Sequence, residues 1–371
     1  MSKAQKDNLI IHVGLPKTGS TTLQRHVFPE ISVMKNITFN PESLQKLLGR
    51  IHFLPDETGT QLAKVKAELR KGPLLVSNEA LVGFQPDDWE AFADRNLEIF
   101  GKDATIILSI RDGEALMKSL FLEMFKQGMQ KSPEYFFLKK DAFVRFKAFR
   151  ASGLLAHFSV DDFDLQRLYE LYATRFEKVY LLPLETLSEG KVFQDIFALS
   201  DAQTAMLRTR ITTAKRENVA YSARGVQLVL LKEKIARVFG LSSFNRMPLE
   251  RILDDLDPEK SEILIEKEKF DRSKFSSLSY QDKRKAFARK VGRKIEYWFS
   301  TRFFIERILD KYLPYKPYQL TQGIYRNEDL NAKNRQFLSD VIREQRESAT
   351  GYIPPGVLLP QAKITSSETT I

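Results

Sequence analysis

Apolar residues gather in four short runs, at residues 9–13, 74–76, 104–110 and 178–183, with longer stretches between them. Short uninterrupted apolar runs, rich in β-branched residues, are typical of buried strands. The stretches between them carry apolar residues at three- and four-residue spacing, which indicates helices. The pattern therefore predicts a βαβ-rich sheet, and ligands bind such sheets at the carboxyl ends of the strands.

Helices are predicted between and after these runs, and several carry end signals. Asn40-Pro41 has the form of an N-cap followed by proline at the first helical position. Gly72-Pro73 closes a second helix. Phenylalanines recur through residues 132–153, a pattern more typical of core packing than of a substrate site. The predicted helices cover residues 42–49, 58–71, 86–100, 132–153, 161–176, 223–238 and 327–348, with one more starting after residue 111.

The first apolar run leads directly into a turn bounded by Gly14 and Gly19, and Ser20-Thr21-Thr22 then opens a helix. A strand, a glycine-rich turn and a helix N-terminus together form a cradle of backbone N–H groups for an anion. Compared with the ATP-type loop G-x-x-x-x-G-K-[ST], both glycines and Thr21 fit the spacing. Ser20 occupies the lysine slot, and the loop's only lysine is Lys17, so its cation reaches the anion from another side.

The strand at 104–110 delivers Arg111 to the same edge of the sheet, and Ser119 follows eight residues later in a predicted helix. An arginine fork and a hydroxyl suit a phosphate monoester. The alternative is that Arg111 is a surface ion-pair partner of Asp112. Together with the glycine-bounded turn, this pair describes a nucleotide that is phosphorylated at both ends, and ATP lacks the second phosphate.

The segment Pro16-Lys-Thr-Gly-Ser-Thr-Thr22 closely resembles the loop with which sulfotransferases bind the 5′-phosphosulfate of PAPS (3′-phosphoadenosine 5′-phosphosulfate). Ile106–Arg111 with Ser119 resembles the element of that family that holds the 3′-phosphate. Gly113 departs from the family's Arg-Asp-Pro, which weakens the helix start. The resemblance, to bacterial-type sulfotransferase domains, covers about residues 1–230 and 325–355. It implies an α/β, P-loop-like three-layer fold with a central parallel sheet, plus a mostly helical insertion.

The resemblance also implies a reaction, namely transfer of a sulfuryl group from PAPS to a hydroxyl or amine, leaving adenosine 3′,5′-bisphosphate. Lys17 would bind the oxygen that bridges sulfur and phosphorus, and Arg111 and Ser119 would hold the 3′-phosphate. The N–H groups and hydroxyls of the loop would hold the 5′-phosphate, through Thr18, Gly19, Ser20, Thr21 and Thr22. No metal is expected.

A base must take the proton of the acceptor. Glu79 is the first candidate, because it follows the second apolar run directly, and a structural acid is the alternative. His52 is the second candidate. His12 lies inside the first apolar run and is expected to be a core histidine.

The predicted organisation is a sulfotransferase core at 1–235, a basic and aromatic insertion at 236–322, a returning part of the core at 323–358 and a disordered tail at 359–371. Within the insertion, residues 283–318 combine a basic run with interleaved aromatics. This segment fits a membrane-surface helix, a nucleic-acid patch, an acceptor lid, or a solvated helix pair packed on the core. We favour a role in shaping the acceptor site or in peripheral membrane contact.

The net charge of +10 suits anionic ligands, and the absence of cysteine excludes disulfides and thiolate zinc sites. No apolar run approaches the ~20 residues that span a bilayer, so we expect a cytoplasmic protein, with peripheral contact at the inner face of the membrane. We expect a glycan or glycolipid acceptor and no nucleic-acid partner. A P-loop kinase, or a non-catalytic basic protein that binds membranes or nucleic acid, are the alternative functions.

Overall fold

The computed structural model describes residues 9–53, 59–83, 85–126, 136–145, 158–214, 222–238, 325–348 and 350–358, and five single positions between 305 and 318. The chain forms two compact units, which are considered separately. The first comprises residues 1–117, 159–216 and 326–371, and the second comprises 118–158 and 217–325. Apart from a few positions, the predicted insertion, including its basic and aromatic segment, lies outside the described residues, as does the predicted tail.

The first unit is built on a five-stranded, all-parallel sheet in the order β2-β3-β1-β4-β7. Its strands are β1 (Leu9–Gly14), β2 (Thr38–Phe39), β3 (Leu74–Ser77), β4 (Thr105–Ile110) and β7 (Lys178–Pro183). The four strands predicted from apolar runs are therefore confirmed. The pattern missed β2, because two residues are too short to form an apolar run.

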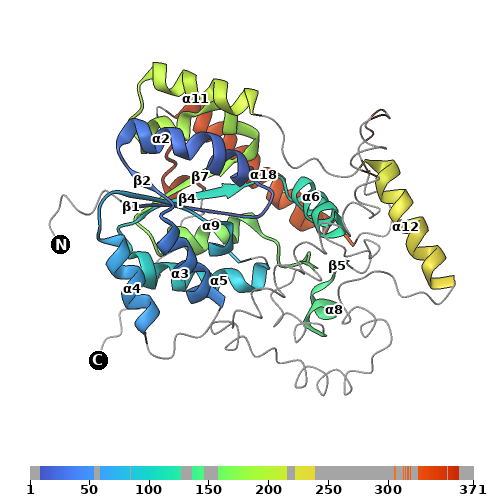
Figure 1. Ribbon diagram of the computed structural model, residues 1–371. Helices are drawn as coiled ribbons and strands as arrows, with labels where there is room; N and C mark the ends of the chain where they lie inside the picture. Colours follow the sequence, from blue (N-terminus) through green and yellow to red (C-terminus); the bar gives the residue numbers. More distant parts are fainter. Residues whose placement is uncertain are drawn as a thin grey trace, which may run out of the picture. The chain divides into compact units, whose positions relative to one another are not determined.

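Helices cover both faces of the sheet, so the unit has three layers (Figure 1). One layer holds α2 (Phe28–Lys35) and α11 (Asp201–Thr213), and the other holds α3 (Glu42–Phe53), α4 (Thr60–Leu69) and α5 (Trp89–Phe100). The helix predicted to begin at Ser20 starts there as α1 (Ser20–Thr22) and continues through the π-helical turn η2 (Leu23–Val27) into α2. The helices α3, α4 and α5 coincide with predicted ones, whereas α10 (Lys191–Ile196) and α11 were not predicted. Short helical turns, η3 (Glu79–Leu81), η4 (Pro86–Asp88) and η6 (Leu184–Glu189), follow strand ends or precede α5.

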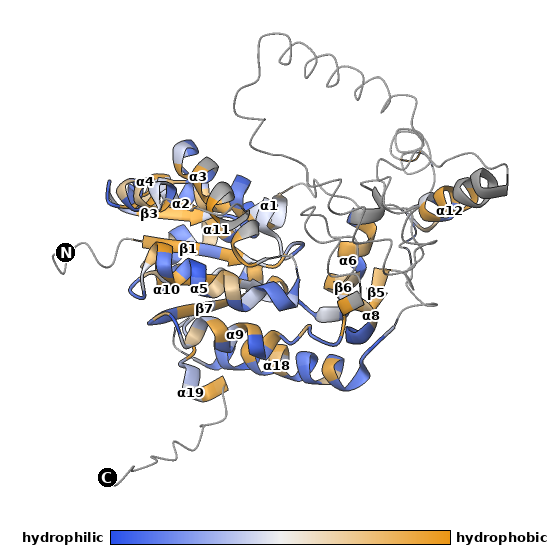
Figure 2. Ribbon diagram, turned by 90° about the horizontal axis from the view of Figure 1, so that it is seen from below, coloured by the Kyte–Doolittle hydropathy of each residue, from blue (hydrophilic) through white to orange (hydrophobic). Residues whose placement is uncertain are grey.

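The last long helix, α18 (Glu328–Glu347), joins this unit beside α9 (Leu165–Ala173) (Figure 2). Buried Asn334 accepts a hydrogen bond from the Leu165 amide at 2.8 Å and donates to the Phe163 carbonyl at 2.7 Å. Buried Gln345 donates to the Leu181 carbonyl of β7 at 2.7 Å. Asn334 thus fastens α18 to the start of α9, and Gln345 fastens it to the sheet. The short α19 (Pro355–Leu358) follows α18.

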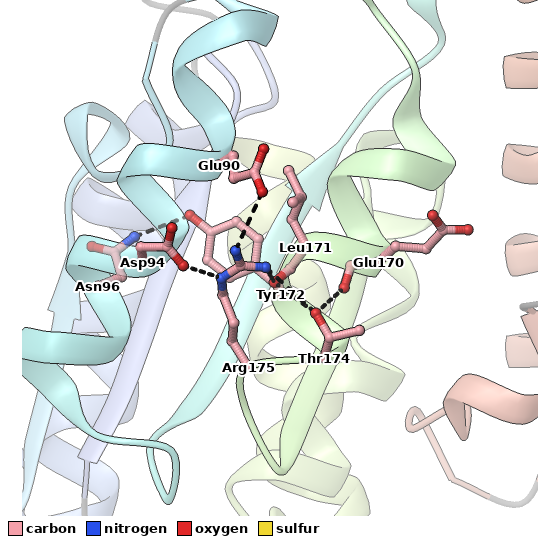
Figure 3. Close-up of polar contacts among 8 residues, drawn as sticks. All are labelled: Glu90, Asp94, Asn96, Glu170, Leu171, Tyr172, Thr174 and Arg175. Atoms are coloured by element: carbon pink, nitrogen blue, oxygen red, sulfur yellow. Dashed lines mark hydrogen bonds and ion pairs between the residues drawn. The ribbon is translucent and has the colours of Figure 1, made fainter. Parts of the chain in front are cut away.

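A polar cluster between α5 and α9 fixes the turn that follows β3 (Figure 3). Asn96 donates to the Tyr172 hydroxyl at 3.0 Å and to the Leu81 carbonyl at 2.7 Å, and the Tyr172 hydroxyl also donates to that carbonyl. At the edge of the cluster, Arg175, which follows the end of α9, forms an ion pair with Asp94 of α5, at 2.7 Å between Nε and Oδ1. Since Leu81 ends the short helix that begins at Glu79, this cluster holds the backbone that carries Glu79.

The second unit contains the small sheet β5 (Phe137–Leu138) with β6 (Phe158–Ser159), α8 (Lys140–Arg145) and α12 (Ala223–Val238). The division between the units falls within α6 (Gly113–Lys126). The prediction of one helix over 132–153 is wrong at β5, because pairing with a strand distant in sequence overrides the local helical pattern. Phe136, Phe137 and Phe143 are buried, as core packing requires.

None of the helices within the described ranges is long and apolar enough to cross a membrane.

Candidate anion-binding site

The turn after β1 is the candidate anion-binding loop. Lys17 and Gly19 both adopt positive φ, at 70° and 91°, with Thr18 between them. Alternation of left- and right-handed residues turns successive N–H groups toward one side and forms an anion-binding concavity. The first helical backbone bond runs from Leu23 N to Gly19 O, so the N–H groups of Ser20 to Thr22 precede the helical ladder.

Gly19 occupies a position that a larger residue would strain. A Cβ atom there would lie 2.8 Å from Cδ1 of Leu184 and 3.2 Å from Cδ2 of Leu187. Gly59 offers a matched comparison, since it also precedes a helix with positive φ, at 65°, and has open space around it. The two glycines therefore share the backbone strain but not the steric contact.

We expect Gly59→Ala to lower the free energy of unfolding by about 1–2 kcal/mol, the cost of a left-handed alanine. Gly19→Ala should lower it by about 1 kcal/mol more, because the leucine side chains behind the loop must shift. Chemical denaturation of both variants measures the difference. Equal losses in the free energy of unfolding would show that a Cβ atom at residue 19 does not displace Leu184 and Leu187 of η6.

Arg111, which follows β4, reaches back to this turn. Its Nη1 donates to the Lys17 carbonyl at 3.0 Å. Burial lowers the pKa of the Arg111 guanidinium from its ordinary value, while the carboxylates of Glu185 and Asp112 act in the opposite direction. The guanidinium is thus a half-buried cation at the loop, with further N–H groups beyond the one that meets Lys17.

The helix that follows Arg111 starts without the proline common in sulfotransferases. The Asp112 carboxylate accepts from the Ala115 amide at 2.8 Å and serves as an N-cap. A Cβ atom on Gly113 would lie 3.3 Å from the Phe163 ring and 3.7 Å from Nδ2 of Asn334. Gly113 therefore permits close packing of this helix start, and the cap replaces what the proline would supply.

Two loop hydroxyls are directed at protein acceptors. The buried Thr18 hydroxyl donates to the Leu15 carbonyl at 2.6 Å and folds the turn back on itself. The buried Ser20 hydroxyl donates to the carboxylate of Glu79, which is half-buried at the end of β3. An anion held here would accept from the backbone N–H groups rather than from these two hydroxyls.

Neutral amide side chains surround the end of β3. Asn40 bonds both the amide and the carbonyl of Ser77, at 2.7 and 3.0 Å, and Gln24 donates to the Ser77 hydroxyl at 3.1 Å. Gln45 links Asn40 to Asn78, at 2.9 and 3.1 Å. This cluster of amide side chains was not predicted from the sequence, because its members come from separate segments and share no local motif.

His12 is completely buried in β1, and both of its ring nitrogens are hydrogen-bonded. Nδ1 lies 2.7 Å from the Ser77 hydroxyl on β3, and Nε2 lies 2.7 Å from the Ser109 hydroxyl on β4. The Phe28 ring packs against the imidazole at 5.2 Å between centroids. No charged group contributes to its pKa, which burial lowers to about 3. The expectation of a core histidine is confirmed.

This lowered pKa has a consequence for stability in acid. The unfolded chain binds a proton at residue 12 below about pH 6.5, whereas the folded protein does not, so stability falls as pH decreases from 6.5 toward 3. At pH 5 the loss from this one group is about 2 kcal/mol relative to neutral pH. We expect His12→Gln to show a smaller loss between pH 7 and 5 in denaturant titrations. An identical loss in both proteins would contradict this.

The remaining predicted residues lie elsewhere. Ser119 lies on α6 in the second unit, so it is not part of the arrangement described for the first. His52 lies in α3, and its side chain is outside the described residues. In the part of the chain that the structure describes, no group of His, Asp and Glu side chains could hold a metal ion. Known protein families and curated proteins gave no match to this chain.

Proposed function

We propose that this protein is a PAPS-dependent sulfotransferase with a P-loop-like fold, transferring a sulfuryl group to a hydroxyl or amine of an acceptor. The observation that carries the proposal is the contact of 3.0 Å between Arg111 Nη1 and the Lys17 carbonyl. This contact brings Arg111, the second cation of the sequence pattern, to the loop that contains Lys17, the first. A half-buried arginine beside a concave set of N–H groups fits a nucleotide with two separate anionic groups.

PAPS would supply the activated sulfuryl group, and the chain would supply positioning and charge neutralisation. The Lys17 ammonium would neutralise the negative charge that develops on the leaving phosphate. Glu79 would take the proton of the acceptor. Ser20 donates to its Oε1 only, so the second carboxylate oxygen has the capacity to act as a base. A glycan or glycolipid acceptor is part of the proposal.

The proposal is tested by calorimetric titration with adenosine 3′,5′-bisphosphate, AMP, and ATP with magnesium, followed by transfer assays with labelled PAPS over a panel of acceptors. We expect the bisphosphate to bind at least ten-fold more tightly than AMP, which lacks the 3′-phosphate. Tighter binding of ATP would favour a kinase instead. Absence of nucleotide binding, with retained binding to anionic vesicles or DNA, would favour a non-catalytic basic protein.

A further inference from the structure

We propose that His12 is a positioning residue of the anion-binding loop, because its imidazole joins the two strands whose ends hold that loop in place. The role in nucleotide binding rests on the proposed function, whereas the role in ordering the loop does not.

The imidazole lies on the strand between β3 and β4 and bonds a serine on each of them. His12 of β1 is paired with Ser77 of β3, and Gly14, two residues later, is paired with Ser109 of β4. The three side chains therefore point to the same face. The neutral ring has one N–H and one bare nitrogen, so it donates to one serine and accepts from the other.

The imidazole also lies directly beneath the turn. A Cβ atom on Gly14 would be 2.9 Å from Cβ of Ser109, 3.3 Å from Nε2 of His12 and 3.3 Å from the Thr18 hydroxyl oxygen. The Leu15 amide donates to the Ser109 carbonyl at 3.4 Å. His12, Ser109 and Thr18 thus close around Gly14, and a change in the ring position is transmitted to the first residue of the loop.

Each serine precedes a residue that contacts the loop. Two residues after Ser77, Glu79 accepts from the Ser20 hydroxyl, and two residues after Ser109, Arg111 donates to the Lys17 carbonyl. The loop is therefore held between the ends of β3 and β4, and the imidazole bonds a side chain near the end of each. The imidazole is uncharged at neutral pH. It therefore links the strands without adding a further cation, besides Lys17 and Arg111, at the anion site.

The test is hydrogen–deuterium exchange of loop residues 14–28 in the full chain without ligand, comparing His12→Phe with His12→Gln. Phenylalanine fills the space but cannot bond either serine, whereas the glutamine amide reaches the position of Nε2 and can bond Ser109. We expect the phenylalanine variant to exchange its loop amides at least ten-fold faster than the original protein, and the glutamine variant to stay within about three-fold of it.

Gln345→Leu is the matched control, because it removes a buried polar contact on β7 rather than on β1. When it lowers stability as much as His12→Phe does, Gln345→Leu should leave the exchange rates of the loop amides unchanged. Should His12→Phe fail to fold, Ser109→Ala removes one partner hydroxyl and should accelerate loop exchange in the same direction. Unchanged loop exchange in the folded variant, or equal acceleration in the control, would overturn the proposal.

The same variants are titrated with adenosine 3′,5′-bisphosphate, where His12→Phe should weaken binding at least ten-fold and His12→Gln no more than three-fold. If the original protein does not bind the nucleotide at all, the proposed function fails, while the exchange experiment still decides the role of His12. If it binds and His12→Phe binds equally well, the positioning role fails and the proposed function stands.

Discussion

Lys17→Ala is expected to reduce sulfuryl transfer from PAPS by about 10²–10³-fold or more, because we propose that its ammonium neutralises the leaving phosphate. The substitution keeps the Lys17 carbonyl, so the hydrogen bond from Arg111 at 3.0 Å is retained. It also keeps a non-glycine residue at the φ of 70°, so backbone strain changes little. The rate constant for transfer should therefore fall far more than the affinity for adenosine 3′,5′-bisphosphate.

Single-turnover assays of transfer and calorimetry of binding separate these two effects. Lys35→Ala serves as the control, since this lysine lies at the surface and donates to the Ala198 carbonyl at 2.8 Å. It should leave both quantities unchanged. Transfer by Lys17→Ala within a few-fold of the original rate would remove Lys17 from the reaction.

Arg111→Ala is expected to weaken binding of adenosine 3′,5′-bisphosphate by about 10–100-fold, the worth of one or two charge-assisted hydrogen bonds. Lysine cannot reproduce the planar fork of arginine, so Arg111→Lys should recover only part of the affinity. Two explanations must be separated. Arg111 either binds the 3′-phosphate itself or supports the loop through the Lys17 carbonyl alone.

AMP distinguishes these explanations, because it has a 5′-phosphate and no 3′-phosphate. If Arg111 binds the 3′-phosphate, the alanine substitution lowers the affinity for the bisphosphate much more than the affinity for AMP. If Arg111 only supports the loop, the affinities for both nucleotides fall by the same factor. Arg210→Ala is a suitable control, since Arg210 of α11 pairs with Glu30 of α2 at the surface, at 3.1 Å. An unchanged affinity for the bisphosphate would place Arg111 outside the nucleotide site.

Much of the sheet could be predicted from the sequence, because buried parallel strands are continuous apolar runs. The runs before Gly14, Ser77 and Arg111 gave β1, β3 and β4 with nearly correct ends. The position of Glu79 beside the loop also followed from this pattern, since neighbouring parallel strands end at one edge. What could be predicted was therefore the part encoded locally in each strand and the residue after it.

The contacts that complete the site could not be predicted in this way. Ser77 and Ser109 are small polar residues at the ends of apolar strands, and only the order of the strands brings both to His12. The short β2 and β5 depend on partners elsewhere in the chain, so local propensity does not reveal them. The hydroxyls of Thr18 and Ser20 were expected to face an anion, and the folded loop directs them to protein atoms instead.

The late position of α18 in the chain has a consequence for biosynthesis. Its Gln345 bonds the carbonyl of Leu181, 164 positions earlier, and its Asn334 bonds the amide of Leu165, 169 positions earlier. While the ribosome is still translating the middle of the chain, the carbonyl of β7 and the first turn of α9 lack these partners. The first unit thus becomes fully packed only after α18 has been synthesised, and until then chaperones would meet an incompletely closed domain.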